Sequence, residues 1–208
     1  MAHYQRAVRA AVILNTGIFG VELIAGWQAS SLSLIMDGIH NFSDQLAIVA
    51  IWLAFIVPRE PSRTLLRGAN VFNSVGLIAV SGVLLWQAVE RFLHPVAVLG
   101  FIPIVVGLAA AAGNYGVARL LREPGQRNAA IRLAYVHNLG DVWVSLAPVL
   151  AGLLLIVSGY SFFDPLIAGA VAVWFIVSTG REVLKSHDEL IWPEKIVCCH
   201  TEHETQSA

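Results

Sequence analysis

Two short stretches of this sequence each place a histidine four residues before an aspartate. The first pair is His40 and Asp44, in the stretch DGIHNFSD, and the second is His137 and Asp141, in YVHNLGD. Residues four apart on a helix lie on one face, about 6 Å apart along the axis. Each pair can therefore direct an imidazole and a carboxylate to one place. Imidazole and carboxylate groups both bind metal ions and carry protons.

The residues around both pairs are strongly apolar. Of the 208 residues, 57% are hydrophobic and 13% are charged, whereas a soluble domain has about 25% charged residues. The chain is therefore predicted to be an integral membrane protein. A net charge of -1 gives no electrostatic reason to expect a nucleic-acid partner. Cys198 and Cys199 are adjacent and cannot join distant parts of the fold, which excludes a disulfide framework.

Six apolar runs are long enough to cross a hydrocarbon core of about 30 Å as helices. The first run follows basic residues, as in a signal peptide, but it continues to Trp27 without a clear cleavage site. We therefore expect it to be retained as the first helix. The predicted fold is an all-α integral membrane protein with six transmembrane helices. The expected spans are 8–29, 32–57, 68–93, 96–121, 130–157 and 164–186.

These spans divide the chain into two parts. Residues 1–186 are expected to form one transmembrane domain, and 187–208 a short, disordered cytoplasmic tail. The tail gathers four side chains that could bind metal, namely Cys198, Cys199, His200 and His203. Their spacing is not that of a common zinc site, so we favour a solvated tail over a metal site.

The basic residues lie on one side of the predicted helices. All 13 Lys and Arg except Arg91 fall at the two ends of the chain or around the second-to-third and fourth-to-fifth connections. Because Lys and Arg concentrate in cytoplasmic loops, both termini are predicted to be cytoplasmic.

Depth along the predicted helices places the two pairs at one level. Asp44 lies about 18 Å into the second helix from outside, and Asp141 lies about 17 Å into the fifth helix from the cytoplasm. The two depths sum to about the thickness of the hydrocarbon core, so both aspartates lie near its midplane on antiparallel helices. If these helices touch, four ligands converge.

The donor set favours zinc among the common metal ions. Two imidazoles and two carboxylates suit a tetrahedral Zn²⁺ site, and two carboxylates neutralise a divalent ion. The lack of a thiolate argues against Cu(I), and the histidines argue against Mg²⁺ and Ca²⁺. Asp37 lies on the same stripe as His40 and Asp44. It could orient a ligand from behind, or it could be a helix-start carboxylate near the outer surface.

Other residues in the predicted helices have more general interpretations. Glu22 could line a water-filled path or make a packing contact, and the sequence does not separate these. Asp164, followed by Pro165, is expected to be a helix N-cap. Pro103 and Pro148 are expected to kink their helices. Hydrogen bonds between helices are expected for Asn15, Asn70, Asn73, Ser74, Ser81 and Asn114.

Three stretches resemble the cation diffusion facilitator family. SLSLIMDGIHNFSDQLAIVAIWLA and RLAYVHNLGDVWVSLAPVLAGLLL are similar to its second and fifth helices, and NTGIFGVELIAGW is similar to its first. The resemblance covers residues of about 10 to 186. It implies that His40, Asp44, His137 and Asp141 bind the transported metal, in the combination of the zinc-preferring branch.

The resemblance further implies a metal–proton exchanger that exports metal from the cytoplasm, usually as a homodimer. Zn²⁺ would be the substrate, with no cofactor, and the location would be a bacterial inner membrane. Three departures are visible. About 22 residues follow the last helix, too few for the soluble domain that usually follows. The His-rich loop between helices four and five is reduced to REPGQRN, and the segment before helix three to RTLLRGANVFNSV. A dimer would then be held by membrane helices.

Three other functions compete with transport. His40 and His137 could be axial ligands of a haem, and Asp44 and Asp141 could form an intramembrane aspartyl protease, since NLGD partly resembles a Gly-x-Gly-Asp signature. Neither function explains why histidine and aspartate occur as pairs. An inert scaffold explains neither residue type. We therefore predict a secondary transporter and not an enzyme.

Overall fold

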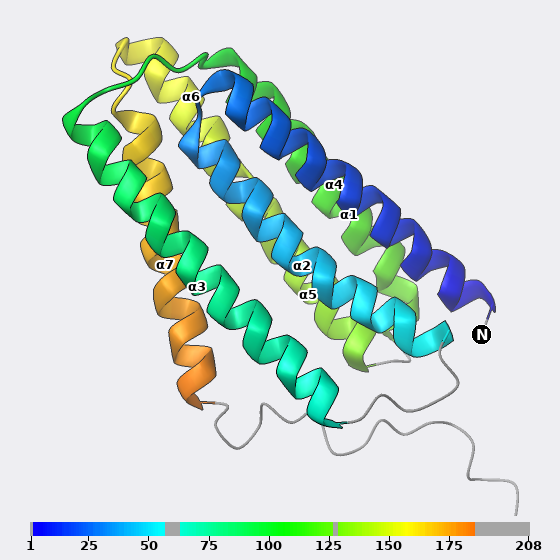
Figure 1. The fold of residues 1–208 in the computed structure, drawn as a ribbon. Helices are drawn as coiled ribbons and strands as arrows, with labels where there is room; N and C mark the ends of the chain where they lie inside the picture. The colour runs from blue at the N-terminus through cyan, green and yellow to red at the C-terminus, as the bar shows by residue number, and fades with distance from the viewer. Residues whose placement is uncertain (1, 57–62, 127–128, 186–208) are drawn as a thin grey trace, which may run out of the picture.

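The computed structural model describes residues 2–56, 63–126 and 129–185, and this part of the chain is helical, without strands. Seven helices follow one another in it, and α5 and α6 together form one rod of a six-rod bundle (Figure 1). The helices are α1 (Ala2–Ala29), α2 (Leu32–Ile56), α3 (Arg63–Leu93), α4 (Phe101–Gly125), α5 (Ala129–Val144), α6 (Leu146–Ser158) and α7 (Phe163–Lys185). The predicted tail at 187–208 lies outside the described residues.

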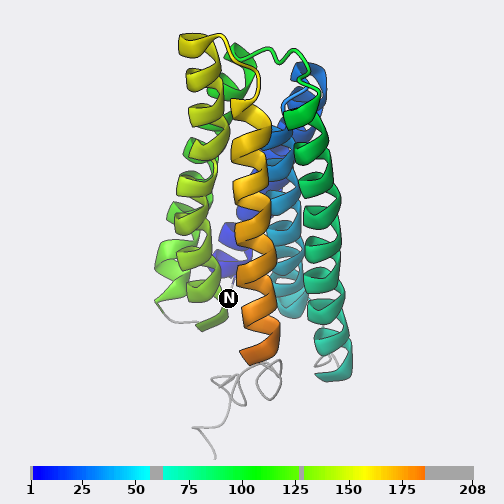
Figure 2. The same cartoon turned by 90° about the vertical axis from the view of Figure 1, so that its left-hand side faces the viewer.

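Successive rods run in opposite directions. The start of α1 and the end of α7 therefore lie at the same end of the bundle (Figures 1 and 2). Three helices begin at least five residues from their predicted starts, namely α1 at Ala2, α3 at Arg63 and α4 at Phe101, and α4 also ends four residues later than predicted, at Gly125. The segment 94–100 is not helical, in keeping with Pro95, which disfavours a helical conformation at the residue before it.

The bundle is a multi-pass membrane structure with a polar helix at its centre. Five stretches of the described helices are long and apolar enough to cross a membrane, namely Arg6–Ala29, Ser74–Leu93, Phe101–Gly125, Ala134–Ser158 and Phe163–Arg181. α2 carries the polar residues between Asp37 and Gln45 within an otherwise apolar sequence. α2 packs against each of the other described helices. Its polar residues are therefore covered by the apolar rods.

Two apolar clusters lie against α2. The cluster shared by α1, α2, α4 and α5 includes Val8, Ile18, Ile48, Val117, Leu121 and Ile131. The cluster shared by α2, α3 and α7 includes Leu32, Met36, Leu84, Ala172 and Phe175. Large apolar side chains such as Trp27, Trp86 and Trp143 are exposed on the outside, where lipid tails are as apolar as the side chains themselves.

The rod of α5 and α6 is interrupted at Ser145. Pro148 has no N–H to offer the carbonyl of Val144 one turn earlier, and the interruption lies where a kink was predicted. Pro103, by contrast, lies in the first turn of α4. A missing N–H there removes no helical hydrogen bond, so Pro103 does not kink α4 in the way predicted.

α6 lies close to α4 because glycines face the contact. A Cβ added at Gly152 would lie 2.5 Å from the carbonyl oxygen of Gly100, and one at Gly107 would lie 3.0 Å from that of Ser145. Such backbone contact is what small residues permit between membrane helices. The α6 half of the rod is thereby fixed against α4.

Asp164 holds the start of α2 rather than the start of its own helix. It lies inside the first turn of α7, so the predicted N-cap role in α7 is wrong. Its Oδ1 accepts a hydrogen bond from Ser31 Oγ at 2.7 Å, and its Oδ2 accepts one from the backbone N–H of Leu32 at 2.6 Å. Ser33 donates to the same carboxylate from both its N–H and its hydroxyl. α7 therefore fixes the end of the helix that carries His40 and Asp44.

Candidate metal centre

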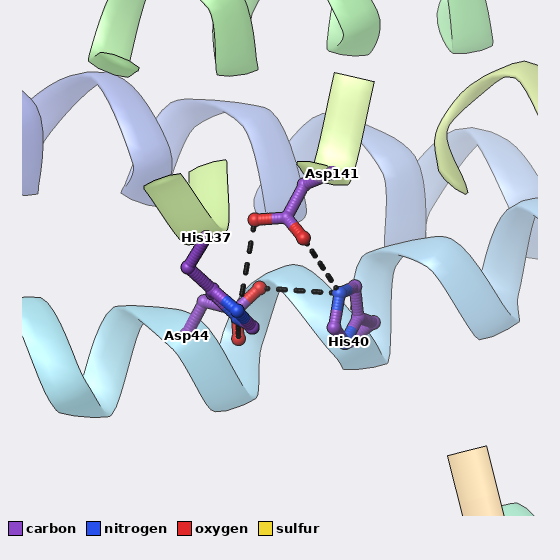
Figure 3. Close-up of side chains that lie close together, drawn as sticks. All are labelled: His40, Asp44, His137 and Asp141. Carbon is purple, nitrogen blue, oxygen red and sulfur yellow. Dashed lines mark hydrogen bonds and ion pairs between the residues drawn. The ribbon is translucent and has the colours of Figure 1, made fainter. Parts of the chain in front are cut away.

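The structure brings His40 and Asp44 of α2 together with His137 and Asp141 of α5 (Figure 3). One ligand atom from each residue lies within 4.8 Å of the other three. The convergence arises because each pair occupies one face of its helix and the two faces meet at the same level of the bundle. Depth and spacing in the sequence had predicted this meeting.

The contacts within the group cross between the two helices. His137 Nε2 lies 2.7 Å from Asp44 Oδ1, and His40 Nε2 lies 3.1 Å from Asp141 Oδ1. Within each helix the distances are longer, at 3.4 Å from His40 Nε2 to Asp44 Oδ2 and 4.0 Å from His137 Nε2 to Asp141 Oδ2. Each imidazole therefore lies within ion-pair distance of both carboxylates.

Three of the four side chains in the group are buried. The side chains of His40, Asp44 and Asp141 are 7%, 8% and 5% exposed, whereas that of His137 is 51% exposed. Both Asp44 Oδ2 and Asp141 Oδ2 are buried and accept no hydrogen bond. Buried carboxylate oxygens without donors are costly unless a cation neutralises them. The arrangement can thus hold a cation that reaches it from the His137 side.

An aromatic ring orients His40. The Phe175 ring of α7 stacks on the imidazole with centroids 4.3 Å apart and an interplanar angle of 26°. His40 Nδ1 is buried and has no hydrogen-bond partner, although a metal-binding histidine commonly donates through its second nitrogen. Stacking, together with the contacts of Nε2, therefore holds the ring. Nothing in the sequence distinguished Phe175 from other core aromatics.

Asp37 and Glu22 are buried beside the group but are not members of it. Asp37 is 2% exposed, which rules out the surface carboxylate considered above, and neither of its oxygens accepts a hydrogen bond. The Asp37 carboxyl group lies beside the carboxyl group of Glu22 and the hydroxyl of Ser145. Glu22 is fully buried between helices and accepts a hydrogen bond of 2.7 Å from Asn41 Nδ2.

The predicted hydrogen bonds between helices occur at some of the named residues. Asn15 donates to the Asn41 carbonyl and to Gln45, and Asn114 donates to Asn41 and Ser145. Ser81 is buried, but its hydroxyl has no partner in the described structure, so the prediction for it is wrong. The side chains of Asn70 and Asn73 lie outside the described part.

Asn41 joins three helices, a role that its place in the sequence did not indicate. An asparagine directly follows each histidine of the two pairs, at positions 41 and 138. This repetition could have drawn attention to both asparagines, but it does not show that their side chains make different hydrogen bonds. Asn138 donates to the Ala134 carbonyl in its own helix, whereas Asn41 joins α1, α2 and α4.

The sequence matches the cation efflux transmembrane domain over residues 8–191. It is 33% identical over 186 residues to the cadmium, cobalt and zinc/H(+)-K(+) antiporter of Bacillus velezensis, covering 83% of this chain and 58% of that protein. It is 27% identical over 187 residues to the zinc transporter ZitB of Escherichia coli, covering 86% of this chain and 60% of that protein.

A human protein is also similar. The proton-coupled zinc antiporter SLC30A8 is 27% identical over 179 residues, which cover 76% of this chain and 48% of that protein. The chain thus spans about half to three fifths of the length of these three relatives.

Proposed function

The chain belongs to the cation efflux family, and we propose that it carries Zn²⁺ out of the cytoplasm in exchange for protons. The observation that carries the proposal is the meeting of two imidazoles and two carboxylates between α2 and α5. The names of the relatives, which include zinc, H⁺ and antiport, support it. These relatives are transporters, so the protease alternative has no support among them.

The four side chains match the bonding preferences of Zn²⁺. Zinc takes nitrogen and oxygen ligands in tetrahedral sets of four, and Nε2 of both histidines faces carboxylate oxygens of both aspartates. Two carboxylates balance the charge of a divalent ion. The two buried oxygens without hydrogen bonds, Asp44 Oδ2 and Asp141 Oδ2, would gain a partner.

Proton exchange follows from the charge that zinc leaves behind. Without the ion, two carboxylates remain inside the membrane, where an aspartate costs about 2.5 to 3.5 kcal/mol even on lenient insertion scales. Protons can replace the ion because imidazole has a reference pKa of about 6.5. An acidic exterior then favours protonation and zinc release, while a near-neutral cytoplasm favours loading. Export is the direction that this difference drives.

The surroundings proposed for the transporter are a bacterial inner membrane, with both chain ends on the cytoplasmic side. We also propose a homodimer held by membrane helices. α3 supports this because, among the described helices, it packs only on α2 and α7. Apolar side chains on its remaining surface are exposed, including Val75, Val83 and Trp86.

The proposed exchange is tested with purified protein in liposomes that contain a pH-sensitive dye. With an acidic lumen and Zn²⁺ added outside, zinc should enter and the lumenal pH should rise, because protons leave as zinc enters. Collapsing the pH gradient with a protonophore should slow zinc uptake, and protein-free liposomes should show neither signal. Zinc flux that ignores the gradient and leaves lumenal pH unchanged would contradict proton exchange.

Metal choice should depend on the nitrogen ligand contributed by His40. Replacing His40 with Asp exchanges a nitrogen donor for an oxygen donor, and ligand type is one determinant of metal selectivity. We expect the Cd²⁺ to Zn²⁺ transport ratio to rise several-fold, measured by competitive uptake in the same liposomes. The matched control is His94→Asp, at an exposed histidine outside the bundle core. An unchanged ratio in His40→Asp would count against a ligand role for His40.

A further inference from the structure

A ring of buried polar side chains lies beside the four-residue group. Its members are Glu22 of α1, Asp37 and Asn41 of α2, Asn114 of α4 and Ser145 at the junction of α5 and α6. All five are at most 2% exposed. The zinc site uses none of them as a ligand, so the presence of two carboxyl groups here needs a separate explanation.

The contacts of this polar ring close on themselves. Asn41 donates to Glu22 Oε2 at 2.7 Å, and Asn114 donates to Asn41 Oδ1 at 3.2 Å and to Ser145 Oγ at 3.0 Å. The Asp37 carboxyl group then lies beside both Ser145 and the Glu22 carboxyl group. α1 and α2 approach closely at this point, since a Cβ added at Gly38 would lie 3.1 Å from Glu22 Cβ.

The polar ring contains more acceptors than donors. Glu22 Oε1, both oxygens of Asp37 and Asn114 Oδ1 are buried and accept no hydrogen bond. The ion pairs of the described residues all join histidine to aspartate, so no Lys or Arg neutralises Glu22 or Asp37 there. Two ionised carboxylates side by side in an apolar bundle repel each other and lack solvation. One proton between them would remove a charge and supply the missing donor.

The polar ring is connected to both helices that carry the four-residue group. Asp37 lies three residues before His40 on one helix face, and the backbone N–H of Ser145 donates to the Asp141 carbonyl at 2.9 Å. The charged groups that face Glu22 and Asp37 are His40 and Asp44 of α2 and Asp141 of α5, while α4 contributes the neutral Asn114. A divalent ion in the four-residue group therefore places positive charge about one helical turn from the pair. That charge favours the fully ionised pair.

We infer that Glu22 and Asp37 form a proton-binding site separate from the metal ligands. The shared proton leaves to water when zinc binds, the pair changing from one negative charge to two, and it returns when zinc leaves. Because linkage is reciprocal, protonation of the pair weakens zinc binding to the same extent. This inference rests on the proposed function and assigns one of the exchanged protons to residues that do not touch the metal.

The test counts the protons released per zinc bound by the full chain in detergent. Zinc is added to weakly buffered protein in choline salts, so that no alkali cation is present, and zinc binding is measured by calorimetry in parallel. The variants are Glu22→Gln and Asp37→Asn, which keep the side-chain shape but cannot share the proton. Glu90→Gln makes the same change at an exposed residue of α3. We expect the first two to release about one proton fewer per zinc than the wild type, and the control to match the wild type.

The possible results separate this inference from the proposed function. Zinc binding that persists with unchanged proton release in both pair variants would overturn the proton site alone. A wild-type protein that binds no zinc would overturn the proposed function and the inference together. Infrared difference spectra of the wild type supply a measurement that needs no variant to fold. The carbonyl band of a protonated carboxylic acid should disappear when zinc is added, and the lack of any such change would reject the inference.

Discussion

Replacement of Asp44 by alanine is expected to abolish zinc transport while leaving the protein inserted in the membrane. Asp44 contacts both histidines, through Oδ1 to His137 at 2.7 Å and through Oδ2 to His40 at 3.4 Å. Without Asp44, only the Asp141 carboxylate remains to balance a divalent ion, and both imidazoles lose their contact with the Asp44 carboxylate. Changing groups that only support metal ligands costs about 10- to 100-fold, so loss of a ligand should reduce transport by at least about 100-fold.

The measurement is the initial rate of zinc uptake into liposomes containing equal amounts of protein. Leu46→Ala is the matched control, because Leu46 lies two residues further along α2 and is 40% exposed. It should transport near the wild-type rate. Asp44→Asn separates charge from shape, since it keeps the size of the side chain but removes its charge, and it should also fail. Wild-type transport by Asp44→Ala would refute the proposed ligand set.

The meeting of the two pairs was predictable because it depends on quantities that a sequence contains. Spacing by four fixes which residues share a helix face, and the distance from the helix start fixes depth. Both were sufficient to bring Asp44 and Asp141 to one level. Six transmembrane rods were likewise predictable from the apolar runs, and the family assignment and the helical bundle confirm that fold class.

Contacts that depend on the rotation of one helix against another were not predictable in this way. Asp164 bonds to Ser31, which lies 133 residues earlier, and the Asp-Pro pattern after a loop indicated only a local cap. Asn41 and Asn138 occupy the same place in the two motifs but bond to different helices. The sequence contains the donors and acceptors, whereas packing decides which of them meet.

The stacking of Phe175 on His40 and the polar ring share this dependence on packing. α2 presents polar groups on several faces, because it contacts all the other described helices. Hydrophobic periodicity identifies a helix with a single buried face. It therefore cannot predict the contacts of a helix that is packed on all sides. The same surroundings explain why α2 can remain polar within a membrane bundle, since its neighbours supply hydrogen bonds to Asn41, Gln45 and the helix start.

Replacement of Asp164 by alanine should destabilise the whole bundle, although Asp164 is far from the ligands along the chain. Its carboxylate accepts bonds from the Leu32 N–H and from Ser31 and Ser33, and all three donors are at most 3% exposed. Loss of a helix cap costs about 0.5–2 kcal/mol, and a buried donor left without a partner costs about 1–3 kcal/mol. Together these give an expected loss of about 3 kcal/mol or more in the free energy of unfolding.

Denaturant unfolding of the purified protein in detergent measures this loss. Asp164→Asn keeps one acceptor oxygen and should fall between the wild type and Asp164→Ala. Glu90→Ala removes an exposed carboxylate near the end of α3, and surface changes of this kind stay within about 0.5 kcal/mol. Because α2 starts at this contact and carries His40 and Asp44, zinc binding by Asp164→Ala should weaken in parallel with its stability. An unchanged unfolding midpoint in Asp164→Ala would show that α7 does not hold the start of α2 in the way the hydrogen bonds indicate.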